Sequence, residues 1–531
     1  MTTTQIILGA AVATPALAAV VALASGGRVG GLSAGPALAA FVLAAALLMA
    51  VAIDGPVSLV AATGSGRAVA GLTADRATAL LLTLVTGVLA IVQAYASRYL
   101  SGDPRAPRFF AVSSLTAAAT GAAICAATFS GFVVAWCLAG AGLCLMLAHR
   151  SDLPQARAGV RRTASALLLG DGALVLALLL VLLTGPDLDL RDPDLTRFAD
   201  QGLTIPLAAL IAICAVARSA QVPLHRWLPA TLNAPTPVSA FMHAGLINGA
   251  GVLLIRLAPL VQPAPVVLWA LLAAGLATAV LATAFMLVRP DVKSGLAWST
   301  GGQMGFMVAQ CATGAFAAAL FHLLCHGVYK ATLFLGSGSA VDARRRHLRA
   351  PAPSPLLAPA PRAAVAIAGP ALMVAGAVAV LAPHLASQAG APLLIAFAWA
   401  SGAQATWGWL GAAGTLSTRT RVAGVAVLAA GSWAYIGAVA AFDAFVGGTL
   451  PTAAAAAPQA WIVLAAIGAA AAAIGLVRFA GPRSAAAERR LYARVWSMSG
   501  PEAVPAQPAT ALRQRRRPAF APEPQLGGVT S

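Results

Sequence analysis

The sequence predicts an all-α polytopic membrane protein with about 14–15 transmembrane helices, some of them broken and arranged as inverted repeats. Its 531 residues are 60% hydrophobic and only 9% charged, with a mean hydropathy of +0.84. A soluble protein of this length needs far more surface charge. Apolar runs long enough to cross a bilayer core of about 30 Å recur along the chain, so a polytopic membrane fold is the class predicted.

Each apolar run is interpreted as one helix, because a helix satisfies its own backbone hydrogen bonds inside lipid. The first run follows no basic segment and precedes no clear cleavage site, so it is expected to be a retained helix rather than a removed signal. The expected spans are residues 5–25, 36–53, 77–97, 109–128, 130–148, 164–184, 203–222, 237–258, 266–288, 294–312, 316–340, 363–386, 392–412, 422–446 and 459–479. Gly369-Pro370 in the twelfth span and the prolines after the seventh favour breaks at equivalent places in two halves.

Charge in the loops predicts the orientation. The net charge is +18, and its distribution favours lipid contact and topology over nucleic-acid binding. Basic loops follow odd-numbered spans, namely 98–108, 149–162, 289–293, 341–362 and 413–421. Loop 185–200, which carries five aspartates, follows an even-numbered span. We therefore expect a multi-pass protein of the bacterial inner membrane, with its N-terminus outside and its C-terminal tail in the cytoplasm.

The chain is expected to divide into four regions. Residues 1–108 hold N-terminal transmembrane helices, 109–345 a proton-conducting core, and 346–480 C-terminal transmembrane helices. Residues 481–531 are rich in proline, alanine, arginine and glutamine. That composition predicts a basic, disordered cytoplasmic tail.

Few ionisable groups are expected at membrane depth, and each is a functional candidate because its insertion costs at least about 2.5 kcal/mol. A buried structural hydrogen bond is the alternative role for any one of them. The chain has only two lysines, Lys293 and Lys330, but 32 arginines. A buried lysine can release its proton and an arginine cannot, so these two positions are expected to need a cation that can release a proton. The candidates are Asp171, Arg218, His243, Lys293, His322, His326 and Lys330.

Three of these candidates are spaced four residues apart in the segment FHLLCHGVYK. His322, His326 and Lys330 therefore fall along one helix face, rising about 6 Å at each step. A zinc site is disfavoured, because Leu323 stands where a metalloprotease helix has its glutamate and no third ligand lies nearby in the sequence. A hydrated proton relay without metal or other cofactor is the preferred interpretation.

The segments ARSAQVPLHRWLPATLNAPTPVSAFMHAG (217–245), RPDVKSGLAWSTGGQMGFM (289–307) and FHLLCHGVYKATLFLGSGS (321–339) carry a family resemblance. Over residues 95–345 the chain resembles the proton-conducting membrane transporters, which include antiporter-like subunits of complex I and of cation/proton antiporters. The resemblance implies a discontinuous seventh helix, inverted repeats and a central polar axis. It aligns Arg218 with the family's key lysine, His243 with the histidine after PTPVSA, Lys293 with the basic residue after the ninth span, and Asp171 with an acid of the sixth.

The departures from the family are informative. Cys137 follows Trp136 where the family has a glutamate, Arg218 replaces a lysine, and span 363–386 has neither lysine nor glutamate. The chain therefore looks closer to the branch that forms the membrane half of a two-component inorganic carbon uptake system. That branch implies H⁺ or Na⁺ flow coupled to a soluble, zinc-containing, β-carbonic-anhydrase-like partner, with no catalysis in this chain. The alternative is a proton-translocating subunit of an NADH–quinone oxidoreductase, hydrogenase or Mrp-type antiporter.

Overall fold

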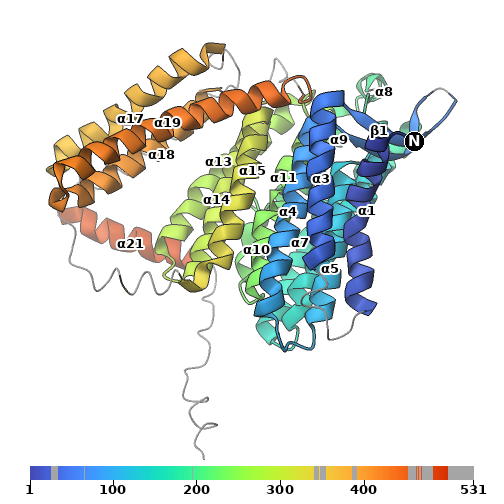
Figure 1. Cartoon of the computed structure of the whole chain (residues 1–531), viewed down its shortest axis with the longest axis horizontal. Helices are drawn as coiled ribbons and strands as arrows, with labels where there is room; N and C mark the ends of the chain where they lie inside the picture. The colour runs from blue at the N-terminus through green and yellow to red at the C-terminus, as the bar shows by residue number, and fades with distance from the viewer. Residues whose placement is uncertain are drawn as a thin grey trace, which may run out of the picture.

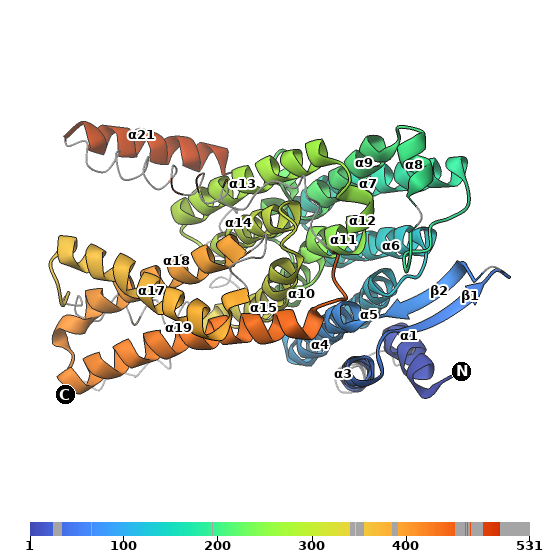
Figure 2. The same ribbon diagram turned by 90° about the horizontal axis from the view of Figure 1, so that it is seen from above.

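The computed structural model describes residues 1–24, 34–339, 355–384, 391–451 and 482–499, apart from positions 65 and 194, with a few isolated residues besides. Helices α1 to α15 form one bundle of roughly parallel rods, and α17 to α19 form a second group that leans steeply against it (Figure 1). Viewed from above, this second group extends from the side of the bundle opposite the N-terminus (Figure 2).

The helices of the first bundle are α1 (Thr3–Ala24), α3 (Ala34–Asp54), α4 (Arg76–Tyr99), α5 (Ala106–Ile124), α6 (Phe129–Leu147), α7 (Pro154–Thr184), α8 (Thr196–Asp200), α9 (Thr204–Arg218), α10 (Thr236–Ala244), α11 (Gly249–Arg256), α12 (Ala258–Val261), α13 (Pro265–Val288), α14 (Val292–Ala312) and α15 (Phe316–Leu335). Short 3-10 turns join them at η2 (Ala148–Arg150), η3 (Leu224–Trp227), η4 (Pro229–Thr231) and η5 (Leu246–Asn248). The second group holds α17 (Pro359–Leu381), α18 (Ala391–Ala412), η7 (Ala413–Thr415) and α19 (Thr418–Val446), and α21 (Pro482–Met498) follows it.

The predicted spans agree with these helices. Each span expected before residue 447 coincides with one helix, or with the pair α10 and α11. Among the described residues, 10 helices are long and apolar enough to cross a membrane by length and composition. The shorter α9 is also apolar, and it ends inside the bundle. The span expected at 459–479 lies almost entirely outside the described residues.

A two-stranded sheet was not expected from the sequence. Strands β1 (Val57–Ala62) and β2 (Ala68–Ala74) pair antiparallel, with Val57 opposite Ala74. Asp75 then caps α4, accepting a hydrogen bond from the Thr78 backbone at 2.8 Å in a reciprocal capping box. We call the end of the bundle that carries this sheet, α8 and the N-terminus the hairpin end, and the opposite end the loop end (Figure 1).

The backbone unwinds at the end of the seventh expected span, and the next span is divided between α10 and α11. Helix α9 ends at Arg218, and Ala220 then adopts a positive φ of 50°. The chain continues through η3 and η4 before α10 begins. Unwound backbone at membrane depth is tolerated where protein buries it, and here Ser219 Oγ bonds to the backbone of Ile247 and Ala250.

Helices α13 and α14 pack with their backbones in close contact. A Cβ atom added to Gly275 would lie 2.6 Å from the Gly305 carbonyl oxygen, and one added to Gly305 would lie 2.5 Å from the Gly275 carbonyl oxygen. Small residues at such crossings let two helix backbones approach, which strengthens packing where lipid removes the hydrophobic driving force.

Two expectations for the C-terminal region are wrong. Helix α17 continues through Pro370, so the break expected there is absent from this described helix; a membrane helix tolerates an internal proline where other groups satisfy the freed carbonyl. Pro482–Met498 form helix α21 instead of belonging to a disordered tail. Val495 packs near Phe285 and Trp298, and Arg289 lies 5.0 Å from the Trp496 ring, so apolar and cation–π contacts hold this helix. Residues 500–531 lie outside the described residues.

Candidate functional site

The structure places Arg218, at the end of α9, beside Asp171 of α7. Arg218 Nη2 lies 3.3 Å from Asp171 Oδ1, and the arginine side chain is 3% exposed. Trp136 on α6 completes the group, donating from Nε1 to Asp171 at 3.2 Å and accepting from Arg218 at its carbonyl oxygen at 2.8 Å. The guanidinium also lies 4.4 Å from the Trp136 ring centroid. Three elements therefore hold one buried ion pair.

Two glycines make room for this ion pair. A Cβ atom at Gly140 would lie 2.7 Å from Asp171 Oδ2 and 2.8 Å from Arg218 Nη1. A Cβ atom at Gly249 would lie 2.6 Å from Arg218 Cγ. All three distances are shorter than ordinary contacts of a Cβ atom, so any larger residue at Gly140 or Gly249 would force the ion pair to shift. Glycine at these two positions therefore leaves the space that the pair occupies.

A polar connection leads from the ion pair to α15 through Asn248, which the sequence analysis missed. Arg218, Trp136 and Asn248 line a small cavity of about 30 Å³, large enough to hold water. Asn248 Oδ1 in turn lies 2.9 Å from His326 Nδ1. The Asp171–Arg218 pair and the histidine stripe are thereby joined across four helices.

The stripe on α15 has a separate polar partner at each position. His322 Nδ1 lies 3.1 Å from Gln310 Oε1, and the rings of His322 and His326 are 6.0 Å apart between centroids. Lys330 is fully buried and donates a hydrogen bond to Ser299 Oγ. The expected rise along one helix face is confirmed, and each group has a neighbour with which it can exchange a hydrogen bond.

The remaining two candidates lie at the edges of this arrangement. His243 on α10 is fully buried and stacks on Phe334, with ring centroids 4.4 Å apart. Neither ring nitrogen of His243 has a hydrogen-bond partner among the described residues. Lys293 donates to the carbonyl oxygens of Leu232 and Ala234 at 3.1 and 2.7 Å, so it holds the segment before α10 rather than contacting Lys330 directly.

A larger cavity opens beside the stripe, between the first bundle and the second group of helices. Its volume is about 600 Å³. Its polar lining comes from α14, α15, α18 and α19, namely Gln303, Gln310, His322, Cys325, His326, Tyr329, Ser401, Gln404 and Tyr435. Charge is scarce in this lining, but hydroxyl, amide and imidazole groups can order a chain of water molecules.

The residues that sequence reasoning missed are uncharged. Trp136 bonds to both members of the ion pair, whereas Asn248, Ser299 and Gln310 each contact one candidate of the stripe, His326, Lys330 and His322 respectively. A signal for Asn248 was present, because it is one of two asparagines in the chain and lies between glycines in an apolar run. A search for charges alone passes over such amides.

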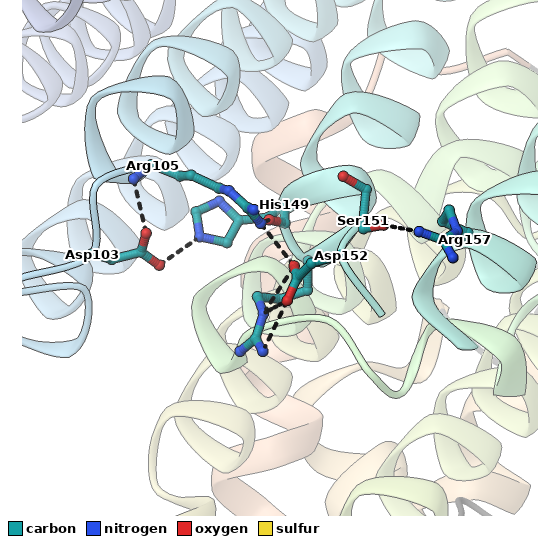
Figure 3. Close-up of polar contacts among 7 residues, drawn as sticks. Asp103, Arg105, His149, Ser151, Asp152 and Arg157 are labelled. Carbon is teal, nitrogen blue, oxygen red and sulfur yellow. Dashed lines mark hydrogen bonds and ion pairs between the residues drawn. The ribbon is translucent and has the colours of Figure 1, made fainter. Parts of the chain in front are cut away.

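A second polar cluster lies at the loop end of the bundle (Figure 3). Asp103 Oδ2 lies 3.0 Å from His149 Nε2, and Arg105 donates to the His149 carbonyl oxygen at 2.7 Å and to Asp152 at 2.8 Å. Partial burial raises the pKa of Asp103, but its hydrogen bonds with His149 and Arg105 outweigh this and leave the pKa below its ordinary value. Hydrogen bonds from Arg105 and Arg150 lower the pKa of Asp152 to about 2. The cluster joins the α4–α5 loop to the segment before α7.

The helix bundle, the backbone that unwinds after α9 and the buried polar axis define an antiporter-like membrane subunit. Residues 126–417 match the family described as NADH:quinone oxidoreductase/Mrp antiporter, TM, and the chain belongs to that family. Residues 61–110 match the N-terminal family of complex I chain 5. The family-level prediction is therefore confirmed.

Relatives within the family have different names. A probable inorganic carbon transporter subunit, DabB1 of Halothiobacillus neapolitanus, is 38% identical over 280 residues, which are 51% of this chain and 50% of the relative. NAD(P)H-quinone oxidoreductase chain 5 of Synechocystis is 36% identical over 289 residues, which are 53% of this chain and 42% of the relative. The chain thus spans about half the length of the curated relatives it matches.

A solved structure of the Mrp complex from Dietzia is similar over most of this chain. The similarity has a TM-score of 0.56 at 26% sequence identity, and it covers 94% of this chain and 52% of the Mrp chain. The shared arrangement therefore extends beyond the conserved core into the C-terminal helices.

Proposed function

We propose that this chain is the membrane subunit of an energy-coupled inorganic carbon uptake complex and that it conducts cations, with H⁺ as the first candidate and Na⁺ as the second. The observation that carries the proposal is its similarity to relatives named as DabB subunits. These are 38% and 34% identical over 280 and 275 residues, and a third, from Hydrogenovibrio crunogenus, is 50% identical over 149 residues.

The polar axis supports cation conduction. A buried ion pair, a small cavity lined by both Arg218 and Asn248, and the Asn248–His326 contact follow one another in this part of the bundle. His322 and Lys330 continue the line in opposite directions along α15. Histidine and buried lysine both exchange protons near neutral pH, so this axis suits a proton relay.

The departures from the antiporter pattern support a modified conduit. Arginine is too basic to release a proton readily, so Arg218 acts as a fixed positive charge beside Asp171. Cys137 offers no carboxylate next to Trp136, and α17 contains no lysine or glutamate. The paired charges that would switch in a self-sufficient antiporter are thus reduced, which fits a subunit whose energy output is used by a partner.

That partner would be a DabA-like soluble zinc protein that resembles β-carbonic anhydrases and carries out the hydration of CO2. This chain then supplies ion flow across a bacterial inner membrane and has no catalytic residues of its own. The N-terminus outside and the C-terminus inside would place the basic loops and helix α21 on the side of a cytoplasmic partner.

A second function is supported by other relatives. The 36% identical chain 5 of a quinone oxidoreductase and the similarity to the Mrp complex favour a proton-translocating subunit of a redox-driven or antiporter assembly. The two functions differ in what the complex contains, because the first needs a zinc hydratase and the second needs redox or antiporter subunits.

The test is growth in ordinary air of a host that lacks carbonic anhydrase. Co-expression of this chain with a DabA-like protein is expected to restore growth, and either chain alone is not. Lys330→Ala and His326→Ala are expected to abolish rescue, whereas Thr332→Ala, at an exposed position on the same helix, should keep it. Stable expression of both chains without rescue would contradict the inorganic carbon function, and rescue by both alanine variants would contradict the assigned ion path.

A further inference from the structure

We propose that Asn248 is a positioning residue that fixes the tautomer of His326, so that Nδ1 carries the proton and Nε2 is the ring atom that accepts one. The assignment of the tautomer stands on hydrogen-bond geometry. Its role in conduction rests on the proton path of the proposed function.

The orientation of the Asn248 amide follows from its second contact. Asn248 Nδ2 donates to the Ala244 carbonyl oxygen at 2.8 Å. A carbonyl oxygen only accepts, so the reversed amide would place two oxygens together with no proton between them. The atom that faces His326 is therefore Oδ1, at 2.9 Å from Nδ1.

An amide oxygen cannot donate, so the His326 ring atom that it contacts must carry a hydrogen. In the neutral imidazole this leaves Nε2 with a lone pair. Nε2 is buried, and it has no hydrogen-bond partner among the described residues. His326 lines the cavity of about 600 Å³, and protonation at Nε2 would leave the bond from Nδ1 to Asn248 intact.

Asn248 is itself held in place. Asn248 is 1% exposed and is the last residue of η5, which follows α10. The next residue, Gly249, lies close to the Arg218 side chain. The comparable pair, Gln310 and His322, lacks this second restraint, because the described Gln310 side chain bonds only to His322. Its amide can reverse and accept either tautomer. The geometry thus singles out one histidine of the stripe.

Other titratable groups also act on His326. His243 faces it from α10, and His322 and Lys330 flank it on α15. Cys325, Tyr329 and Tyr435 share its cavity. Among the described residues, none of these groups forms a hydrogen bond with His326 Nδ1, which contacts Asn248. Replacing Asn248 changes the ring's hydrogen-bond partner and leaves these neighbours in place.

The first measurement is the tautomer itself. Full-length protein labelled with ¹⁵N-histidine would be placed in lipid bilayers at pH 8, where an ordinary imidazole with a pKa of about 6.5 is neutral. Solid-state NMR distinguishes a protonated from a bare ring nitrogen, and the His326 signals are those lost in His326→Gln. We expect a protonated Nδ1 and a bare Nε2. A protonated Nε2 in the unmodified protein would overturn the proposal.

Variants then test the cause. Asn248→Leu removes the acceptor, so the Nδ1–H signal of His326 is expected to give way to Nε2–H, while Gln310→Leu leaves it unchanged. An unchanged His326 tautomer in a folded Asn248→Leu protein would overturn the role of Asn248. These spectra do not depend on transport. Failure of the growth rescue would therefore contradict the proposed uptake function but would leave the assignment of the His326 tautomer unaffected.

A functional readout separates positioning from simple support. Asn248→Asp keeps an oxygen acceptor toward Nδ1–H but adds a negative charge that favours the doubly protonated ring. Proton release then requires more alkaline conditions, so the pH profile of ion flux in proteoliposomes should shift to higher pH. A uniform loss of flux at every pH, with no shift, would contradict the positioning role.

Discussion

At the scale of single residues, the protein balances each buried charge with a specific contact. The Asp171–Arg218 pair would be costly in a low-dielectric interior without further hydrogen bonds. Trp136 supplies a donor to the carboxylate, an acceptor for the guanidinium and a ring face for the cation. In the proposed ion path, the Arg218 guanidinium supplies a fixed positive charge beside Asp171 and the neighbouring cavity, because an arginine is too basic to act as a proton shuttle.

A substitution at Gly140 tests this pair. Gly140→Ala places a methyl group 2.7 Å from Asp171 Oδ2 and 2.8 Å from Arg218 Nη1, so the two side chains must shift from their present positions. We expect ion flux through the complex to fall strongly while the protein still folds. Gly172→Ala is the matched control, because a Cβ atom there meets nothing within 4 Å and lies next to the same aspartate in sequence. Equal flux in both variants would show that the ion pair is dispensable.

The charged members of the site could be predicted from the sequence because a charge inside an apolar span is conspicuous. The uncharged members could not be ranked in the same way. Serine, asparagine and glutamine occur in apolar helices for many reasons, and only the fold shows that Asn248 meets His326 or that Ser299 meets Lys330.

At the scale of elements, the loops are as specifically built as the helices. In the loop-end cluster, the buried His149 contacts Asp103 through its ring and Arg105 through its carbonyl oxygen (Figure 3). Phe109 of α5 packs edge-on against the His149 ring at 6.2 Å. The start of α5 is therefore attached to η2, at the point where α7 begins.

The stability of this connection should depend on pH. The pKa of Asp103 is lowered on folding, so its contribution is complete above the unfolded value of about 3.9 and disappears as the pH falls through the folded value. Asp103→Asn should lower the free energy of unfolding by about 1.5–3 kcal/mol at pH 7, the range for a hydrogen bond to a charged group. Thermal unfolding followed by tryptophan fluorescence should show the difference from the unmodified protein shrinking near pH 3.

A control for this prediction lies in the same cluster. Asp152 is 42% exposed and pairs with Arg105 and Arg150, so its ion pairs are screened by solvent. Asp152→Asn should therefore destabilise less than Asp103→Asn at pH 7. A larger effect at Asp152, or a difference at Asp103 that grows on acidification, would contradict the assignment.

Element boundaries show why local patterns predict some elements and miss others. Long apolar runs predict helices such as α4, because about 20 consecutive apolar residues are enough to cross the bilayer core as a helix. The hairpin of Val57–Ala62 and Ala68–Ala74 is too short for that criterion and lies outside the spans. Helix α21 combines arginines with Leu491, Val495 and Trp496. The overall composition of this region predicts disorder, because it does not show that Val495 packs against the bundle.

At the scale of the whole molecule, charge and architecture agree. The arginine-rich α4–α5 loop and the segment before α7 lie at the loop end. Loop 185–200, with its five aspartates, lies at the hairpin end, where Asp189 accepts from the Ala68 backbone at 2.9 Å. One end of the described bundle is thus basic and the other acidic, a polarity that predicts the basic end on the cytoplasmic side, because positively charged loops are retained there.

Labelling of single cysteines tests this orientation. Asp192→Cys at the hairpin end and Gln155→Cys at the loop end both occupy exposed positions. In intact cells a membrane-impermeant maleimide should label Asp192→Cys, while Gln155→Cys should react only after the membrane is permeabilised. The unmodified protein, whose described cysteines include the exposed Cys325, provides the background. The reverse pattern would place the basic end outside, and a cytoplasmic partner could then not reach the loop-end cluster or α21.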